Sequence, residues 1–204
     1  TTGSVVRLEH REDGVGADDM IFGHSAADIP LGDDSIMDDD IIIGGFGGDK
    51  IYANLGNDVI IGDEGEVDFD LDTTTDLPDG DISTMDLVQS LNFGLGGTDD
   101  IFAGEGEDIV IGGFESDEIH GEVGSDILFG DNGRVELLAG EVRFLFATDT
   151  DPATGSDDVL YGDGVGVNPV SPDHTFNDII IGGLAADTIE GNLGDDIIGG
   201  DNLE

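Results

Sequence analysis

Aspartates recur along this chain at a fixed spacing, and hard carboxylate oxygens held in such a series are suited to binding cations. They follow the pattern Asp-x-apolar-x-Gly, as in Asp58-Val59-Ile60-Ile61-Gly62 and Asp187-Thr188-Ile189-Glu190-Gly191. Most neighbours in the series lie nine residues apart. The candidate metal ligands are the aspartates that share this phase: Asp19, Asp28, Asp40, Asp49, Asp58, Asp99, Asp108, Asp117, Asp126, Asp158, Asp178, Asp187 and Asp196.

Glycine-rich turns precede these aspartates, as in Gly44-Gly45-Phe46-Gly47-Gly48 before Asp49. Glycine reaches backbone conformations with φ > 0 at little cost and leaves its carbonyl oxygen accessible. A turn of this kind that ends in a carboxylate supplies the all-oxygen ligand set that Ca²⁺ prefers over metals that seek nitrogen or sulfur. The repeat therefore predicts several bound Ca²⁺ ions.

The composition agrees with cationic partners. The chain has 49 acidic residues against 5 basic ones, a formal charge of −44, and no cysteine. Nucleic acid and anionic lipid surfaces would be repelled, and the apolar runs are too short for membrane insertion. A salt-adapted protein could be equally acidic, but its carboxylates would be scattered over the surface instead of being fixed to a nine-residue phase.

Two of the repeats, Gly44–Tyr52 and Gly121–Phe129, resemble the nonapeptide G-G-x-G-x-D-x-U-x of repeats-in-toxin (RTX), or hemolysin-type, calcium-binding proteins. The resemblance implies an all-β fold, a right-handed parallel β-roll (β-solenoid) in which six residues form a turn and three a strand, with two repeats to each coil. It also implies Ca²⁺-dependent folding outside the cell. The resemblance extends to the long-array adhesins and surface proteins of that family.

Stacked coils would place aspartates that are 18 residues apart next to each other, and the series contains the pairs Asp40/Asp58, Asp99/Asp117, Asp108/Asp126 and Asp178/Asp196. Two carboxylates about 5 Å apart repel by roughly 3 kcal/mol at an effective dielectric constant near 20. Each pair would therefore resist folding until a divalent cation lies between the carboxylates. Folding and Ca²⁺ binding should be one event.

Side chains alternate along a strand, so the central apolar residue of each repeat should point into the roll. The expected core is Ile21, Ile42, Ile51, Ile60, Ile101, Val110, Ile119, Leu128, Leu160, Ile180, Ile189 and Ile198. The outward residues alternate between apolar pairs and pairs such as Lys50/Tyr52 and Glu118/His120, which predicts one apolar and one polar outer face. The apolar face needs a cover.

Two inserts interrupt the repeats and are expected to supply that cover. In the second, 134–138 and 142–146 flank Ala139-Gly140 and predict a β-hairpin. In the first, the segment 85–88 fits either a strand or a short helix. The predicted organisation is one continuous solenoid, with repeats at 1–65, 93–133 and 154–204 and inserted hairpins at 66–92 and 134–153.

The repeat is irregular in places. The gaps from Asp28 to Asp40 and from Asp158 to Asp178 are longer than nine, Pro30 stands at an inward position, and Ala185 replaces a turn glycine. Ca²⁺ sites at these turns are expected to be weaker or purely structural. The four histidines are isolated, and we interpret each as a surface residue.

No catalytic motif accompanies the repeats, and carboxylates committed to a cation are poor proton carriers, so we predict that the chain is not an enzyme. The favoured function is a Ca²⁺-stiffened structural segment of a stalk, adhesin, surface layer or fibre. Its partners would be Ca²⁺, neighbouring repeats of the same array and like chains. It would lie outside the cell or on its surface, and the resemblance implies export by type I secretion. The alternative is a calcium-dependent folding or secretion module of a secreted enzyme or toxin. The chain is expected to be cut from within a longer array.

Overall fold

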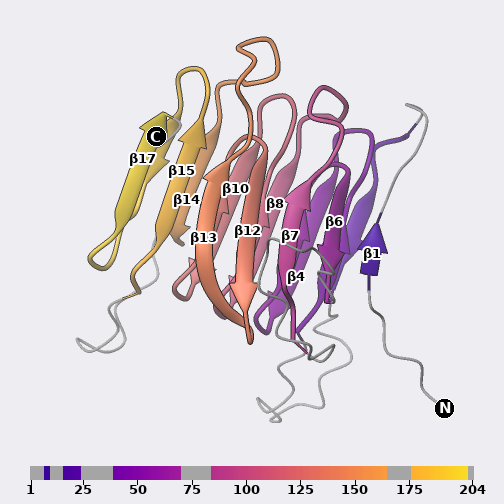
Figure 1. The fold of residues 1–204 in the computed structure, drawn as a ribbon. Helices are drawn as coiled ribbons and strands as arrows, with labels where there is room; N and C mark the ends of the chain where they lie inside the picture. The colour runs from indigo at the N-terminus through magenta and orange to yellow at the C-terminus, as the bar shows by residue number, and fades with distance from the viewer. Residues whose placement is uncertain (1–6, 10–15, 24–38, 70–83, 165–175, 202–204) are drawn as a thin grey trace, which may run out of the picture.

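The computed structural model describes residues 7–9, 16–23, 39–69, 84–164 and 176–201. In these residues it contains strands and turns and no helix. Three sheets lie in layers (Figure 1), and we name them the back, middle and cover sheets. The chain alternates between the back and middle sheets, and each passage is a turn of the repeat.

The back and middle sheets are parallel and have six strands each. The back sheet consists, in spatial order, of β16 (Thr188–Glu190), β14 (Val159–Asp163), β10 (Glu118–Val123), β8 (Asp100–Glu105), β4 (Lys50–Leu55) and β2 (Met20–Phe22). The middle sheet consists of β17 (Ile197–Asp201), β15 (Ile179–Gly183), β11 (Ile127–Phe129), β9 (Ile109–Ile111), β5 (Val59–Ile61) and β3 (Ile41–Ile43). This arrangement confirms the parallel β-roll.

The first apolar core lies between the back and middle sheets. The central residue of each short strand points inward because side chains alternate, and the adjacent strand supplies the same position in register. Every residue predicted for this core belongs to it except Ile198, which is 49% exposed in the end strand β17. Ala53 and Ala103, within β4 and β8, complete the core.

The cover sheet is antiparallel and packs on the outer face of the middle sheet. It contains β1 (Arg7–Glu9), β6 (Gly65–Asp68), β7 (Leu87–Ser90), β12 (Gly133–Leu138) and β13 (Glu141–Ala147) in that order. A second apolar core forms between the middle and cover sheets. The middle sheet contributes Ile61, Ile111 and Phe129, and the cover sheet contributes Val88 and Val135. The inserts therefore cover the apolar face.

The two inserts form their strands in different ways. Ala139 and Gly140, at φ 54° and 76°, form the tight turn of the β12–β13 hairpin, as the sequence predicts. The segment that fits either a strand or a helix is the strand β7, which pairs with both β6 and β12. The helical alternative is wrong because a helix would leave the edges of β6 and β12 unpaired over the apolar face.

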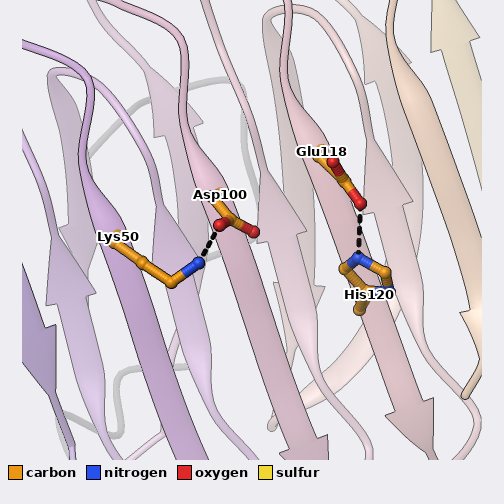
Figure 2. Close-up of polar contacts among 4 residues, drawn as sticks. All are labelled: Lys50, Asp100, Glu118 and His120. Atoms are coloured by element: carbon orange, nitrogen blue, oxygen red, sulfur yellow. Dashed lines mark hydrogen bonds and ion pairs between the residues drawn. The ribbon is translucent and has the colours of Figure 1, made fainter.

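The outer face of the back sheet, expected to be polar, also contains a column of stacked rings. Parallel pairing in register stacks one ring per strand into a column of Phe22, Tyr52, Phe102, His120 and Tyr161, with neighbouring ring centroids 4.6 to 5.3 Å apart. His120, expected to be a surface residue, lies on this outer face and stacks within the column. Figure 2 shows the charged groups beside the column: Lys50 reaches Asp100, and the His120 Nε2 atom is hydrogen-bonded to the Glu118 carboxylate.

Candidate metal-binding site

The in-phase aspartates form two continuous ladders, one along each edge of the roll. In each step the Oδ1 atom of one aspartate accepts the backbone N–H of the aspartate in the neighbouring coil, at 2.7 to 3.1 Å. The first ladder contains Asp19, Asp49, Asp99, Asp117, Asp158 and Asp187. The second contains Asp40, Asp58, Asp108, Asp126, Asp178 and Asp196.

The predicted 18-residue pairs are all neighbours in these ladders. The irregular spacings do not interrupt the ladders: Asp40 and Asp178 occupy regular places in the second ladder. Asp28 lies outside the described residues, as do Pro30 and the other three histidines. Ala185 takes a positive φ of 85° in place of glycine, and Asp187 still accepts the N–H of Asp158.

The second carboxylate oxygen has no hydrogen-bond partner along most of both ladders. These buried Oδ2 atoms belong to Asp40, Asp49, Asp58, Asp99, Asp108, Asp117, Asp126, Asp158, Asp178 and Asp187. Most of these side chains are no more than 2% exposed. A buried polar atom without a partner is costly, and a repeated row of such atoms indicates that something else satisfies them.

Backbone carbonyl oxygens converge on the spaces beside these Oδ2 atoms. At Gly121, a Cβ atom would lie 2.5 Å from both the Asp126 Oδ2 atom and the Gly162 carbonyl oxygen. Other glycines at this place face an equivalent pair of oxygens, with Asp49 and Gly62 at Gly44 and with Asp117 and Gly130 at Gly112. Glycine leaves open the space on which the two oxygens converge, whereas two of the turns have Ala53 and Ala103 at the equivalent place.

Burial also raises the pKa values of the ladder carboxyl groups. Desolvation raises the pKa of Asp58 and Asp178 to about 6, of Asp108 to about 7, and of Asp99 and Asp126 to about 8, although the backbone N–H bonds oppose the shift. Neighbouring carboxylates in the ladder add to the increase, as Asp108 does for Asp126. An ionised ladder is therefore unfavourable without a positive charge beside it.

The donor set fits Ca²⁺. The available ligands are carboxylate and carbonyl oxygens, which are those that Ca²⁺ takes in proteins. Within the described residues, no group of three or more His, Cys, Asp or Glu side chains forms a metal site by itself. The glycine carbonyl oxygens beside the Oδ2 atoms are available as further ligands. A bound Ca²⁺ would supply the positive charge that the Oδ2 atoms lack, and each would be held by ladder carboxylates together with glycine carbonyls.

Sequence reasoning missed a second polar row beside the ladders. The residue before an in-phase aspartate accepts a backbone N–H from the next coil, as Asp39 does from Asn57 and Asn57 does from Glu107, at 2.9 Å in both cases. Ser125 and Asn177 continue the row. The frequent Asp, Asn or Ser at this place was the signal that could have revealed it.

A second missed group consists of aspartates that hold the inserts in place. Turns that carry an insert begin Gly-Asp, and the Asp63 carboxylate accepts N–H groups from Gly97, where the insert ends, and from Phe114 in the next coil. Asp131 does the same with Ser156 and Leu184. Burial raises the pKa of Asp63 to about 9. The Gly-Asp pairs were visible in the sequence, but their role was not.

The fold and the ladders together define a class of protein, a parallel β-roll whose glycine turns direct oxygen atoms at cations. A comparison with protein families matches the RTX calcium-binding nonapeptide repeat in four copies, at residues 37–66, 93–110, 102–135 and 175–202. Through these segments the chain belongs to the RTX calcium-binding repeat family. Comparisons with curated proteins and with solved structures gave no match. The described residues form no helix that could span a membrane.

Proposed function

We propose that this chain is a structural segment of an extracellular protein, a stalk, adhesin, surface layer or fibre, that folds and stiffens when Ca²⁺ binds along both ladders. The observation that carries the proposal is the row of buried Oδ2 atoms without partners. The ligands in the proposal are the ladder aspartates, together with Asp28. The division into repeat blocks and inserts described above is part of the same proposal.

Several features support a mechanical role. Carboxylates such as those of Asp117 and Asp158 link one coil to the next and also face a glycine carbonyl, so a cation at these steps would join adjacent coils. The cover sheet adds a third layer that stiffens the roll on one side. RTX repeats are typically found in secreted proteins, and millimolar extracellular Ca²⁺ suits sites whose affinity is weakened by the cost of folding.

The test is far-UV circular dichroism of the chain, titrated with Ca²⁺ from a chelated start. We expect a cooperative change from coil to β structure, and we expect Mg²⁺ at equal ionic strength to fail because it demands small octahedral sites and gives up its water reluctantly. A β spectrum that is already complete in chelator would overturn the proposal and leave a metal-independent acidic solenoid.

A further inference from the structure

Asp163 has a buried carboxylate oxygen without a hydrogen-bond partner, although it belongs to neither ladder. The residue ends β14 and is 1% exposed, and the oxygen is its Oδ1 atom. Burial raises the pKa of this carboxyl group, because its ionised form is costly without a positive charge or a donor beside it. The Oδ1 atom therefore needs a partner that the described protein atoms do not supply.

Two other aspartates occupy the equivalent place and have both oxygens bonded. Asp63 and Asp131 also follow the first glycine of a Gly-Asp turn, and each accepts a backbone N–H at both oxygens. One donor comes from the next coil, and Asp163 keeps this bond through the N–H of Leu193, which lies 2.7 Å from Oδ2. The other donor is the residue two places before a ladder aspartate, which for Asp163 is Phe176. Since Oδ1 accepts no hydrogen bond, this second bond is not made, and Oδ1 is left for a different ligand.

A ladder oxygen and a carbonyl oxygen lie beside Asp163. At Gly162, a Cβ atom would lie 2.1 Å from the Asp178 Oδ2 atom and 2.7 Å from the Gly191 carbonyl oxygen. Burial raises the pKa of Asp178 to about 6, and the charge of Asp163 adds to the increase, so the two carboxylates lie near each other. The Asp178 Oδ2 atom also has no hydrogen-bond partner. Two incompletely satisfied carboxylates therefore border one space.

The Gly191 carbonyl oxygen can serve this space as well. It accepts the N–H of Asp163 at 3.4 Å, and a carbonyl oxygen has a second lone pair with which it can bind a cation. The same turn holds Asp163 in position, because the Asn192 side chain donates to the Asp163 carbonyl oxygen at 3.0 Å and Leu193 donates to Oδ2. A ligand that is fixed before the cation arrives loses less conformational entropy on binding.

We propose that Asp163 is a Ca²⁺ ligand outside the nonapeptide pattern, and that its Oδ1 atom binds an ion together with the Asp178 Oδ2 atom and the Gly191 carbonyl oxygen. All three are the hard oxygen ligands that Ca²⁺ takes in proteins, and the second carboxylate adds ligand charge, which is one of the factors that set Ca²⁺ affinity. The ion would join the Gly-Asp turn of β14 to the next coil. The inference rests on the proposed function, since this space exists only in the folded roll.

The probe is Tb³⁺, which takes the same oxygen ligands as Ca²⁺ and emits light when a nearby tyrosine is excited. The chain has two tyrosines, and Tyr161 stands two residues before Asp163. Every chain in the experiment therefore carries Tyr52→Phe, which keeps a ring in the stacked column. The emission excited through Tyr161 then reports ions bound near the Asp163 turn, and added Ca²⁺ should displace them.

Asp163→Asn separates metal binding from the structural bond. Asparagine keeps an oxygen for the Leu193 N–H, but the NH₂ group in place of Oδ1 cannot bind a cation. Half-saturation of the emission should therefore shift to a higher Tb³⁺ concentration. Asp195→Asn is the matched control, since it removes the same formal charge from an exposed position in the neighbouring turn, and it should leave half-saturation unchanged.

The possible failures have different meanings. A chain that shows no Ca²⁺-dependent β structure overturns the proposed function and this inference together. A chain that folds with Ca²⁺ but has the same half-saturation in Asp163→Asn as in Asp195→Asn overturns the inference alone. An Asp163→Asn chain that does not fold at any Ca²⁺ concentration also overturns the inference, because more metal restores a weakened metal site but not a broken structural contact.

Discussion

At the scale of single residues, each ladder aspartate divides its two oxygens between two tasks. Oδ1 accepts a backbone N–H and sets the stacking of the coils, while Oδ2 remains without a protein partner. A substitution can separate the tasks, because asparagine keeps an oxygen for the N–H bond but replaces the other oxygen with an amide NH₂ group that donates and cannot bind a cation.

Asp117→Asn is therefore expected to raise the Ca²⁺ concentration at the folding midpoint, because one site loses a charged ligand while the coils keep their N–H bond. Asp117 lies in the middle of the first ladder and is 2% exposed. Glu141→Gln removes the same formal charge from an exposed position and is the control. Equal midpoints in the two variants, measured by circular dichroism, would contradict the assignment.

The pKa shifts predict how the metal-free chain responds to pH. In the folded state the pKa of Asp126 is raised to about 8 and that of Asp58 to about 6, against an unfolded value near 3.9. The folded state thus holds protons that the unfolded state has released, so its stability is greatest below about pH 4 and falls as pH rises towards 8. In chelator, β structure should increase on acidification, and a flat profile would refute this expectation.

Protons compete with Ca²⁺ only where the metal-free chain holds them. At pH 6 to 8 the metal-free chain is expected to be unfolded, and its carboxyl groups, with pKa values near 3.9, are ionised. Ca²⁺-coupled folding should therefore release few protons, and the Ca²⁺ midpoint should change little over this range. Isothermal titration in buffers of different ionisation enthalpy measures the protons released, and a large release would mean that the metal-free chain is already folded with protonated ladder carboxyl groups.

At the scale of elements, the inserts depend on the aspartates that follow the first glycine of their turns. Asp131→Ala removes the acceptor for the N–H groups of Ser156 and Leu184, so the β12–β13 hairpin, which lies between Asp131 and Ser156 in the chain, should become mobile. Trypsin should then cleave faster at Arg134 and Arg143. Glu141→Ala, within the same hairpin, should leave the cleavage rate unchanged, and similar rates in both variants would mean that the carboxylate does not hold the insert.

The second core is expected to contribute as much as an ordinary protein interior. Phe129 is 1% exposed between the middle and cover sheets, so Phe129→Ala should reduce the free energy of unfolding by about 3–5 kcal/mol. Phe146→Ala, on the exposed side of the cover sheet, should cost less than about 1 kcal/mol. Denaturant unfolding at saturating Ca²⁺ measures both, and a small effect at Phe129 would mean that the cover sheet is only loosely attached.

At the scale of the whole molecule, a charge of −44 opposes every compact state. For 204 residues, the usual size relations give a radius of gyration of about 17 Å when folded and about 49 Å when unfolded. Small-angle X-ray scattering should follow the change from the larger towards the smaller value as Ca²⁺ is added. A compact chain in chelator would show that the ladders do not need the metal to approach each other.

The sequence by itself determined the nine-residue repeat and the local features that follow from it, which are the turns, the short strands and the inward side chains. The nine-residue phase placed the ladder aspartates and nearly the whole first core, because side-chain alternation and glycine turns act within a few residues. It also predicted the β12–β13 hairpin, whose turn is encoded by Ala139-Gly140. These features need no knowledge of distant partners.

Only the tertiary structure decided which segments meet across long gaps. It joined Asp49 to Asp99, Asp58 to Asp108 and Asp126 to Asp178 across long gaps. It also stacked His120 between Phe102 and Tyr161 and made residues 87–90 a strand. Finally, it showed that Asp63 and Asp131 hold the inserts. The physical reason is that these features depend on the register between strands of different coils. Loop length does not reveal this register, because packing against the middle sheet fixes it.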